Sequence, residues 1–304
     1  IHQYAPLDIT KWVNRFLETW KPQLTIWIES DLWPITLHLL KKKSIKSILI
    51  NSRISPQSYQ KWKFIKFFYK NIVSTFDEIY AQSPLDKKRI EFLTNREVNY
   101  IGNLKLSSIE SNNKDISSDN FKSNLNSFII LMFASTHQAE EEKILELLKN
   151  TLAKCNKLKI IIAPRHPERS NKILSILKKQ NINSNFFKDS KNLEEDVLIV
   201  DSFGKMSLYF SLSDIVILGG SFVKMGGHNP IEPANNNCAI ITGPHIYNWE
   251  NIFTDMIDSG ACYMFSNSIE IENFLFDLFN DSEKLNSIKN KAQKFSEKKF
   301  FQSE

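Results

Sequence analysis

Short apolar runs alternate with amphipathic stretches along most of this 304-residue chain. This alternation is typical of α/β proteins in which helices join parallel strands. The strands are expected at residues 24–28, 47–50, 79–81, 99–101, 128–134, 158–163, 197–200, 215–218 and 239–241. The helices are expected at residues 33–42, 58–75, 84–93, 139–155 and 171–180. The sequence therefore predicts an α/β protein with parallel sheets.

Residues 107–126 interrupt the alternation, because they are rich in Ser, Asn, Asp and Lys and have few apolar side chains. Such a composition predicts a polar linker. The chain then divides into a Rossmann-like domain at residues 1–106 and a second Rossmann-like domain at residues 127–304. Because the chain starts at Ile1 in apparently folded sequence, we expect the first domain to be incomplete at its start.

The bulk composition excludes some classes of protein. A net charge of +5 is too small to indicate nucleic-acid binding, although it suits anionic substrates or an anionic membrane face. Cys155, Cys238 and Cys262 have no metal-binding spacing and cannot all pair, which favours a reducing compartment. No apolar run is long enough to span a bilayer.

Glycines are scarce and clustered. The chain has eight, and seven of them fall between Gly204 and Gly260. Glycine is expected where the backbone needs a positive φ or must approach a ligand closely. Ordinary turns explain one or two of these positions, but the clustering predicts a binding region.

The densest motif is GGSFVKMGGHNPIEP at residues 219–233, directly after a predicted strand. A strand that leads into a glycine-rich loop and a helix is a phosphate-binding arrangement. Asn229 is expected to cap this helix, with Pro230 at its first position. Glu232 has two alternatives: it closes a capping box, or it accepts hydrogen bonds from a ribose diol. The nearby glycines favour the ribose.

Two further loops of the second domain follow predicted strands. In APRHPER, residues 163–169, Arg165 offers a fork of donors suited to a phosphate, with a surface ion pair as the alternative. His166 has a structural or a catalytic role as alternatives, and a lone histidine in a loop is more often structural. After the strand at 197–200, Gly204 allows a tight turn, and a helix is expected to start near Lys205 with free N–H groups that attract anions.

In the first domain, WIESDLWP (residues 27–34) follows a strand and precedes a helix. Glu29 and Asp31 are either first-turn acids of that helix or groups that face a cleft. In GNLK, residues 102–105, Lys105 is placed to stabilise charge on a leaving phosphate, or is simply exposed.

KWKFIKFFYK, residues 61–70, interleaves lysines with aromatic residues. On one helix, an apolar face would contain Trp62, Ile65, Phe68, Tyr69 and Ile72. Binding to an anionic membrane surface and core packing with snorkelling lysines both explain the pattern.

Nine strings occur in the order found in the Kdo transferases, which move 3-deoxy-D-manno-octulosonic acid (Kdo) from CMP-Kdo to lipid A precursors. They are IHQYAPLD, IESDLWP, NSRIS, GNLK, ASTHQAEEE, APRHPER, LGGSFV, GGHNPIEP and GPHIYNW. The chain resembles this family along nearly its whole length.

The resemblance implies the GT-B architecture, with two Rossmann-like domains facing a cleft. It implies inverting, metal-independent transfer from CMP-Kdo to lipid IVA at the cytoplasmic face of the inner membrane, with no cofactor and no nucleic acid. Glu29 and Lys105 match the positions that stabilise the transition state. The implied donor-binding residues are Pro164, Arg165, Phe203, Gly204, Lys205, Gly226, Gly227, His228, Asn229, Pro230, Ile231 and Glu232.

Some residues depart from the family pattern. The family usually has Glu at Asp31 and often Glu at Lys205. The glutamate that acts as general base, and any membrane anchor, belong to a segment upstream of Ile1 in the family. The alternatives are another GT-B transferase or epimerase that uses a UDP- or GDP-sugar, and a catalytically incomplete nucleotide-binding fragment.

Overall fold

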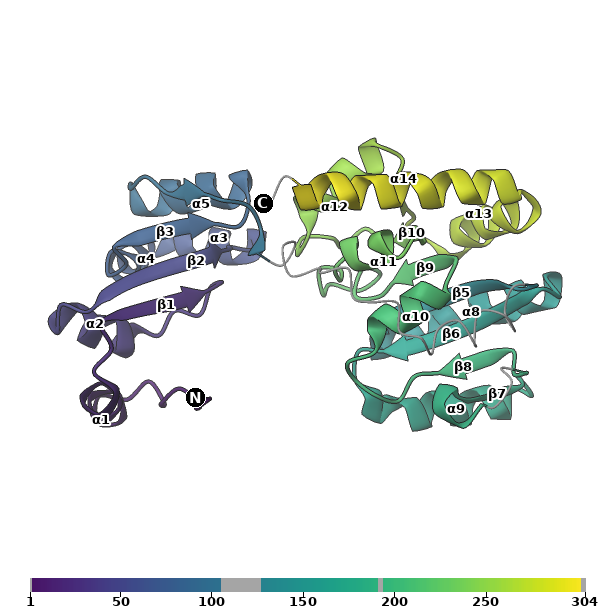
Figure 1. Ribbon diagram of the computed structural model, residues 1–304, viewed down its shortest axis with the longest axis horizontal. Coiled ribbons are helices and arrows are strands. Elements are labelled where there is room, and N and C mark those ends of the chain that lie inside the picture. The colour runs from purple at the N-terminus through teal and green to yellow at the C-terminus, as the bar shows by residue number, and fades with distance from the viewer. Residues whose placement is uncertain (1, 105–126, 191–193, 302–304) are drawn as a thin grey trace. The chain divides into compact units, whose positions relative to one another are not determined.

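The computed structural model describes residues 2–104, 127–190 and 194–301, which form two compact units (Figure 1). Lys105 and the predicted linker at residues 107–126 lie outside the described residues. Each unit contains one parallel sheet, so the predicted α/β class is confirmed.

The first unit has a four-stranded sheet in the order β1-β2-β3-β4. Its elements are α1 (Thr10–Trp20), β1 (Leu24–Ile28), α2 (Pro34–Lys42), β2 (Lys46–Ser52), α3 (Pro56–Phe64), α4 (Lys66–Val73), β3 (Glu78–Ala81), α5 (Pro84–Thr94) and β4 (Asn99–Tyr100). Ser55 and Ser83 cap α3 and α5, because each hydroxyl accepts a hydrogen bond from a backbone N–H in the first turn. A proline follows each cap, as is usual at the first position of a helix.

The second unit has a seven-stranded sheet in the order β11-β10-β9-β5-β6-β8-β7. Its strands are β5 (Ile129–Thr136), β6 (Leu158–Pro164), β7 (Ser184–Phe186), β8 (Val197–Ile199), β9 (Ile215–Leu218), β10 (Ala239–Thr242) and β11 (Tyr263–Met264). Its α-helices are α8 (Gln138–Lys154), α9 (Ser170–Lys179), α10 (Met206–Leu212), α11 (Ile231–Asn235), α12 (Glu250–Asp258), α13 (Ser268–Asn280) and α14 (Ser282–Phe301).

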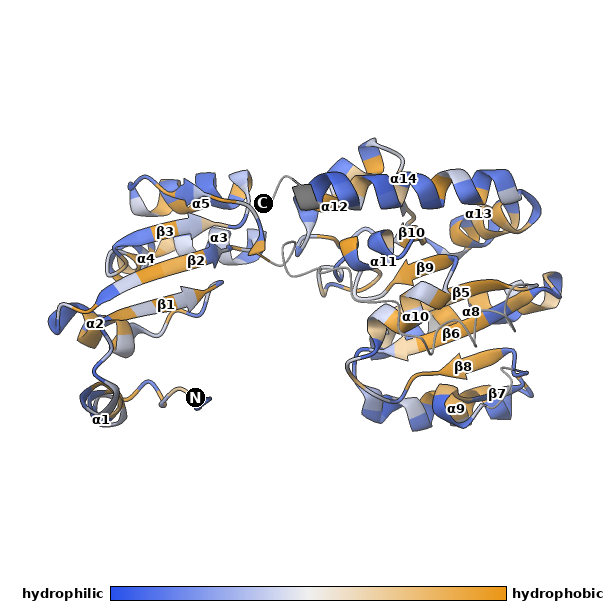
Figure 2. Ribbon diagram, viewed as in Figure 1, coloured by the Kyte–Doolittle hydropathy of each residue, from blue (hydrophilic) through white to orange (hydrophobic). Residues whose placement is uncertain are grey.

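The central strands of the second unit are buried along their whole length. Every residue of β6, β8, β9 and β10 is buried, so both faces of the sheet are covered. Figure 2 shows these strands as mainly apolar and the helices as mixed. The side chains of one face pack with α8, α9 and α13 in a single cluster.

The structure differs from the sequence-based prediction in three places. The helix predicted at residues 58–75 is two helices, because Ile65 leaves the helical conformation at φ −122° and ψ 40°. The short strands β7 and β11 were missed, since β7 is not an apolar run and β11 has only two residues. Helix α1 and the C-terminal helices α12 to α14 were also not predicted.

Candidate functional site

The strand order of the second unit creates a topological switch point between β5 and β9. The chain passes from β5 to β6 on one side, and later returns to place β9 on the other side of β5. In open parallel sheets, ligands bind outside the carboxyl ends of the strands at such a point. The predicted donor-binding loops follow β6, β8 and β9, so all of them start at this edge of the sheet.

The glycine-rich loop starts at the end of β9 and approaches β5 very closely. Gly219 donates its N–H to Ala134 O at 2.8 Å, and a Cβ at Gly219 would lie 2.5 Å from Ser135 O. Gly226 and Gly227 have positive φ values, which side chains other than glycine rarely adopt. The close approach to β5 and the positive φ values therefore explain why glycines occupy these positions of the loop.

Glu140, at the start of α8, fixes the glycine-rich loop through hydrogen bonds to its backbone. Its carboxylate accepts hydrogen bonds from the N–H groups of Gly220 at 2.8 Å, Phe222 at 3.0 Å and His137 at 3.0 Å. The side chain is buried, so these charge-assisted bonds have little competition from water. Sequence reasoning gave Glu140 no role, although a glutamate three residues after a helix start is a recognisable capping signal.

The segment after β10 holds the other end of the loop. Asn248 donates from Nδ2 to Met225 O at 2.8 Å, and Tyr247 donates its hydroxyl to Lys224 O at 2.6 Å. Ser221 Oγ accepts the Gly243 N–H at 2.7 Å. The string GPHIYNW therefore has a structural role in fixing the shape of the glycine-rich loop.

Pro164 is the last residue of β6, and Arg165 begins the following loop with its side chain exposed. The Arg165 N–H donates to Thr136 O at 2.9 Å, which fixes its backbone beside β5. Among the described residues no ion pair of Arg165 is recorded, so the surface-pair alternative is not supported. Arg169 instead makes the ion pair of this loop, with a two-pronged contact to Glu141 on α8.

Two histidines meet at the switch point. Nε2 of His137, after β5, lies 3.0 Å from Nε2 of His228 in the glycine-rich loop. Burial, His137 and Arg165 together lower the pKa of His228 to about 4. Burial also lowers the pKa of His137, with smaller contributions from His166 and Arg165. Both rings are therefore neutral at pH 7, and Arg165 is the cation of this group.

The loop after β8 is open. Phe203, Gly204 and Lys205 are exposed, and a Cβ on Gly204 would contact nothing within 4 Å. Gly204 has a positive φ of 87°, and α10 starts directly after Lys205, as predicted. Because α10 packs against α11, this loop and the start of α11 lie on neighbouring helices.

Helix α11 starts one residue later than predicted, because Pro230 is its N-cap and Ile231 is its first helical residue. Asn229 Oδ1 accepts the N–H of Ile231 at 3.0 Å, and Pro230 already has helical backbone angles. Burial raises the pKa of the Glu232 carboxyl group. No hydrogen bond to this carboxylate is recorded among the described residues, so the capping-box alternative is not observed.

The first unit has a cavity of about 370 Å³ at the carboxyl ends of β1 and β2. Its lining includes Glu29, Arg53, Ser55, Ser58, Trp62 and Tyr69. Glu29 has a φ of 65°, which is strained for a residue with a long side chain. Helix α2 begins at Pro34, so the alternative that Glu29 and Asp31 are first-turn acids is wrong. The first turn of α2 is instead capped by Asp8, which accepts the Thr36 N–H at 2.7 Å.

The strings NSRIS and GNLK meet at the end of β2. Asn51 Oδ1 accepts the N–H of Leu104 at 3.2 Å, and Asp86 Oδ1 accepts the N–H of Ile54 at 2.9 Å. Burial raises the pKa of Tyr69, so its hydroxyl remains a donor in the cavity at neutral pH. Lys105, the residue after Leu104, lies outside the described residues.

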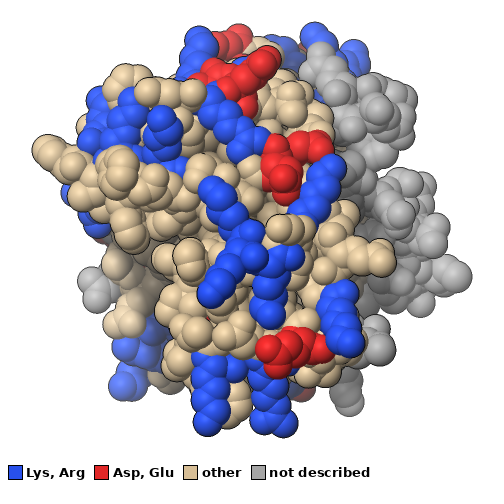
Figure 3. Space-filling model, turned by 90° about the vertical axis from the view of Figure 1, so that its left-hand side faces the viewer, with Lys and Arg blue, Asp and Glu red and all other residues tan. Residues whose placement is uncertain are grey.

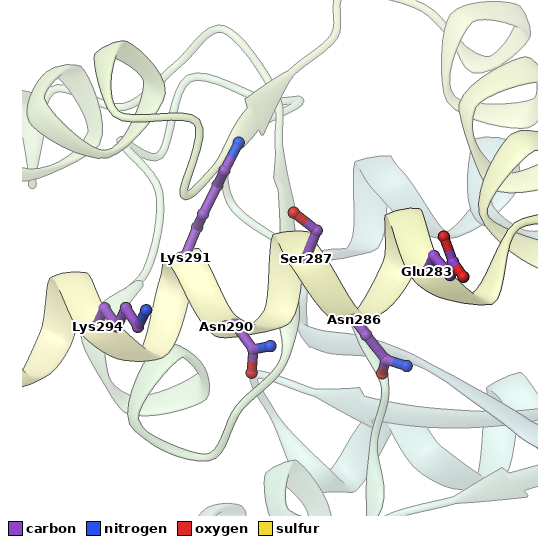
Figure 4. Close-up of a pocket in the computed structure, with 6 residues that line it drawn as sticks. All are labelled: Glu283, Asn286, Ser287, Asn290, Lys291 and Lys294. Carbon is purple, nitrogen blue, oxygen red and sulfur yellow. The ribbon is translucent and has the colours of Figure 1, made fainter.

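A second hollow, of about 570 Å³, runs along α14. All six residues that line it come from that one helix, and Figure 4 shows Lys291 and Asn286 pointing to opposite sides. It is a surface groove without convergent groups, and we assign it no function.

The described residues contain neither a metal-binding cluster nor a membrane-spanning helix. Among residues 2–104 and 127–301, apart from 191–193, no three His, Cys, Asp or Glu side chains are grouped to hold a metal ion. None of the helices described here is long and apolar enough to cross a membrane.

Comparisons with known proteins match both units to the same family. Residues 1–108 match the family model of 3-deoxy-D-manno-octulosonic-acid transferase. The chain is 34% identical to the 3-deoxy-D-manno-octulosonic acid transferase of Rickettsia felis over 98% of its own length and 64% of that protein. With the transferase of Rickettsia bellii it shares 34% identity over 98% of this chain and 72% of the relative. The chain thus spans about two thirds of the length of these relatives.

Solved structures identify the fold. The C-terminal CMP-Kdo binding domain of WaaA from Acinetobacter baumannii is 28% identical, with a TM-score of 0.55, and the match covers 59% of this chain and 95% of that domain. HepE from Anabaena in complex with UDP has a TM-score of 0.61 at 12% identity, covering 95% of this chain and 78% of HepE, which shows the fold alone. The fold is that of the GT-B glycosyltransferases, as expected. On the sequence identity to its relatives, the chain belongs to the 3-deoxy-D-manno-octulosonic acid (Kdo) transferase family.

Proposed function

We propose that this chain provides the donor-binding unit and part of the acceptor-binding unit of an enzyme that transfers Kdo from CMP-Kdo to a lipid A precursor, lipid IVA. The enzyme would act at the cytoplasmic face of the inner membrane. The observation that carries the proposal is that the predicted donor-binding loops all start at the β5–β9 switch-point edge of the sheet, in a unit that is 28% identical to the CMP-Kdo binding domain of WaaA.

Each donor-binding residue has a role that its surroundings support. Arg165 is exposed and pairs with no carboxylate in the described part of the chain, and it would bind the phosphate of CMP. Glu232 is half-buried, its carboxylate accepts no hydrogen bond from the described residues, and it would accept bonds from the ribose hydroxyls. Burying a carboxylate without partners is costly, so a ligand that donates two hydroxyls would relieve that cost.

The remaining donor-binding residues would act mainly through the backbone and through shape. Phe203 and Gly204 would contact the nucleotide, and the backbone of Lys205 would do so even though its charge is opposite to that of the usual family residue. Gly226, Gly227 and His228 would shape the loop beside the sugar, with Asn229, Pro230 and Ile231 fixing the start of α11. Pro164 would pack next to the base.

The proposed reaction is a single in-line displacement with inversion at the anomeric carbon. A glutamate upstream of this chain would deprotonate a glucosamine hydroxyl of the acceptor, and that oxygen would attack as CMP leaves. Glu29, held at the cavity of the first unit, and Lys105 would stabilise the transition state. Because Arg165 and Lys105 can offset the charge on the leaving phosphate, the proposal needs neither a metal nor a cofactor.

Nucleotide titration tests the donor site. We expect the chain to bind CMP in preference to UDP and GMP, and Arg165→Ala and Glu232→Gln each to raise the Kd for CMP about tenfold. Lys178→Ala and Glu297→Gln, at exposed positions on α9 and α14, are matched controls and should leave the Kd unchanged. Equal binding of UDP would instead favour a transferase or epimerase for another sugar nucleotide.

Transfer itself is tested in the protein that includes the upstream segment. Glu29→Gln should lower kcat strongly and leave CMP binding unchanged, because Glu29 belongs to the other unit. If this chain binds CMP but the longer protein transfers no Kdo to lipid IVA, the catalytically incomplete alternative is favoured.

A further inference from the structure

Two histidine rings are fixed against each other at the switch point of the second unit. Nε2 of His137, which follows β5, lies 3.0 Å from Nε2 of His228 in the glycine-rich loop. The rings are nearly parallel, with an interplanar angle of 9° and centroids 5.3 Å apart. A Cβ at Gly220 would lie 3.1 Å from Nε2 of His228 and 3.3 Å from Nε2 of His137, so the loop backbone packs against their contact. We call these two residues the histidine pair.

The position of each proton in the histidine pair follows from its partners. Both rings are neutral at pH 7, because burial lowers the pKa of each. A neutral imidazole has one N–H and one bare nitrogen, so one Nε2 donates and the other accepts. The capping box at the start of α8 places the Glu140 N–H against the His137 side chain, which makes Nδ1 of His137 the bare nitrogen. Nε2–H of His137 therefore donates to His228, and the proton of His228 is on Nδ1.

Nδ1 of His228 is a donor that is open to a ligand. Gly220 packs against Nε2 and Cδ2 of this ring, and Nδ1 is on the opposite edge. Within the described part of the chain Nδ1 makes no hydrogen bond, and it is not one of the buried side-chain atoms that lack a partner. The histidine pair therefore directs one N–H group away from the loop backbone.

The surroundings of the histidine pair favour an anionic group. Besides burial, the Arg165 guanidinium contributes to the lowered pKa of both histidines, so it lies near both rings. The two neighbouring carboxylates are already engaged, because Glu140 accepts three backbone N–H groups and Glu141 pairs with Arg169. A guanidinium and an N–H donor at one edge attract a carboxylate or a phosphate.

We propose that the histidine pair recognises the carboxylate of the donor sugar, with His228 donating its Nδ1–H to that group and His137 acting as a positioning residue. The inference rests on the proposed function, in which the donor is an acid sugar joined to CMP. Glu232 is an acceptor and suits the ribose hydroxyls, whereas Nδ1–H is a donor and suits a group that only accepts. Arg165 remains for the phosphate. His137 sets the direction of the Nδ1–H group, because it holds the other side of the His228 ring.

Titration with CMP and with freshly prepared CMP-Kdo separates the sugar contacts from the nucleotide contacts. We expect the chain to bind CMP-Kdo more tightly than CMP. His228→Gln keeps a polar group near Nε2 but has no donor near Nδ1, so it should reduce this preference about tenfold and leave the Kd for CMP unchanged. His228→Asn places its amide nitrogen near Nδ1 and should retain most of the preference.

The positioning role of His137 is tested through the same preference. His137→Ala leaves the Nδ1–H of His228 in place but removes the partner of its Nε2, so the preference for CMP-Kdo should fall several-fold. Adding His137→Ala to His228→Gln should cause no further loss, because His137 acts through His228. Losses that multiply in the double variant would contradict the positioning role.

Charge on the first unit requires a control. Lys and Arg outnumber Asp and Glu on the face of the first unit that Figure 3 shows. Such a surface attracts any anionic ligand, and salt screens that attraction. The titrations are therefore run at two salt concentrations, and the preference for CMP-Kdo should persist at the higher one. His38→Asn, an exposed histidine on α2, and Gly260→Ala, which follows α12, control for the loss of an imidazole and for a small loss of stability. Neither should change the preference.

Two outcomes would overturn the inference. The first is a His228→Gln variant that melts cooperatively and keeps the full preference for CMP-Kdo. The second is a His228→Asn variant that loses as much as His228→Gln does, which would mean that only the contact inside the pair matters. A chain that binds CMP selectively and shows no preference for CMP-Kdo refutes the role of the histidine pair and leaves the proposed function standing. A folded chain that binds neither ligand refutes both.

Discussion

At the scale of single residues, the candidate donor site depends on groups that hold the ligand-binding groups in place. The Glu140 carboxylate is not accessible to a ligand, because it is buried and its oxygens accept hydrogen bonds from three backbone N–H groups. It fixes the start of the glycine-rich loop relative to β5. Such a residue affects binding through the shape of the loop.

We expect Glu140→Gln to destabilise the second unit by about 2–4 kcal/mol, because the amide replaces a charged acceptor and brings a donor toward backbone N–H groups. Urea denaturation would measure the change. Glu146→Gln, at an exposed position of the same helix, should cost almost nothing. Similar midpoints for the two variants would show that the buried carboxylate does not hold the loop.

The lowered pKa of His228 predicts that the stability of the folded chain depends on pH. Its pKa is about 4 in the folded chain and 6.5 when exposed, so the unfolded chain binds more protons between these values. Stability should therefore fall as the pH drops from 6.5 to 4, by about 2 kcal/mol from this residue. The acid loss measured by urea denaturation should be smaller in His228→Asn and unchanged in His38→Asn, an exposed control on α2.

At the scale of elements, the glycine-rich loop is held between β5 and the segment after β10. Gly219 lies so close to β5 that a Cβ at this position would be 2.5 Å from the backbone oxygen of Ser135. That oxygen can move away only if the backbone of β5 shifts. Gly260 also has a positive φ, but a Cβ there would meet only the flexible end of Lys291 at 3.5 Å.

Gly219→Ala should therefore destabilise the chain by about 2–4 kcal/mol, because strand β5 or the loop must shift. Gly260→Ala should cost about 1 kcal/mol, from backbone strain alone. Thermal melts of both variants, with and without CMP, would measure the difference. Equal losses would mean that the close approach of the loop to β5 adds nothing to the strain of a positive φ.

Most helices and strands could be predicted from the sequence, but fewer of the contacts in the candidate site could be. Strands such as β6 were predictable because they are continuous apolar runs, and α11 because Asn229 and Pro230 mark its start. The break at Ile65 was not predictable, because no glycine or proline interrupts residues 58–75. The contact between His137 and His228 was also not predictable, because 91 residues separate them and strand order brings them together.

At the scale of the whole molecule, the second unit contains a complete hydrophobic core. The cluster on one face of its sheet runs from Leu131 to Ile288 and includes no residue of the first unit. A domain with its own core is expected to fold alone.

Residues 127–301 produced alone should therefore bind CMP with the affinity of the whole chain. Calorimetric titration of both proteins would compare the two Kd values directly. A much weaker Kd for residues 127–301, in a sample that melts cooperatively, would show that the first unit contributes to CMP binding.

The sheet of the first unit is less covered at β1 than the central strands of the second unit are. Among the residues that the structure describes, strand β1 pairs with β2 alone, and Ile26 and Ile28 are 58% and 59% exposed. Along such an edge, alternate backbone amides point toward the neighbouring strand and the others point away from it. In deuterated water, the amides of β1 should therefore exchange in two classes that alternate residue by residue, with the outward class gaining deuterium as fast as an unstructured peptide.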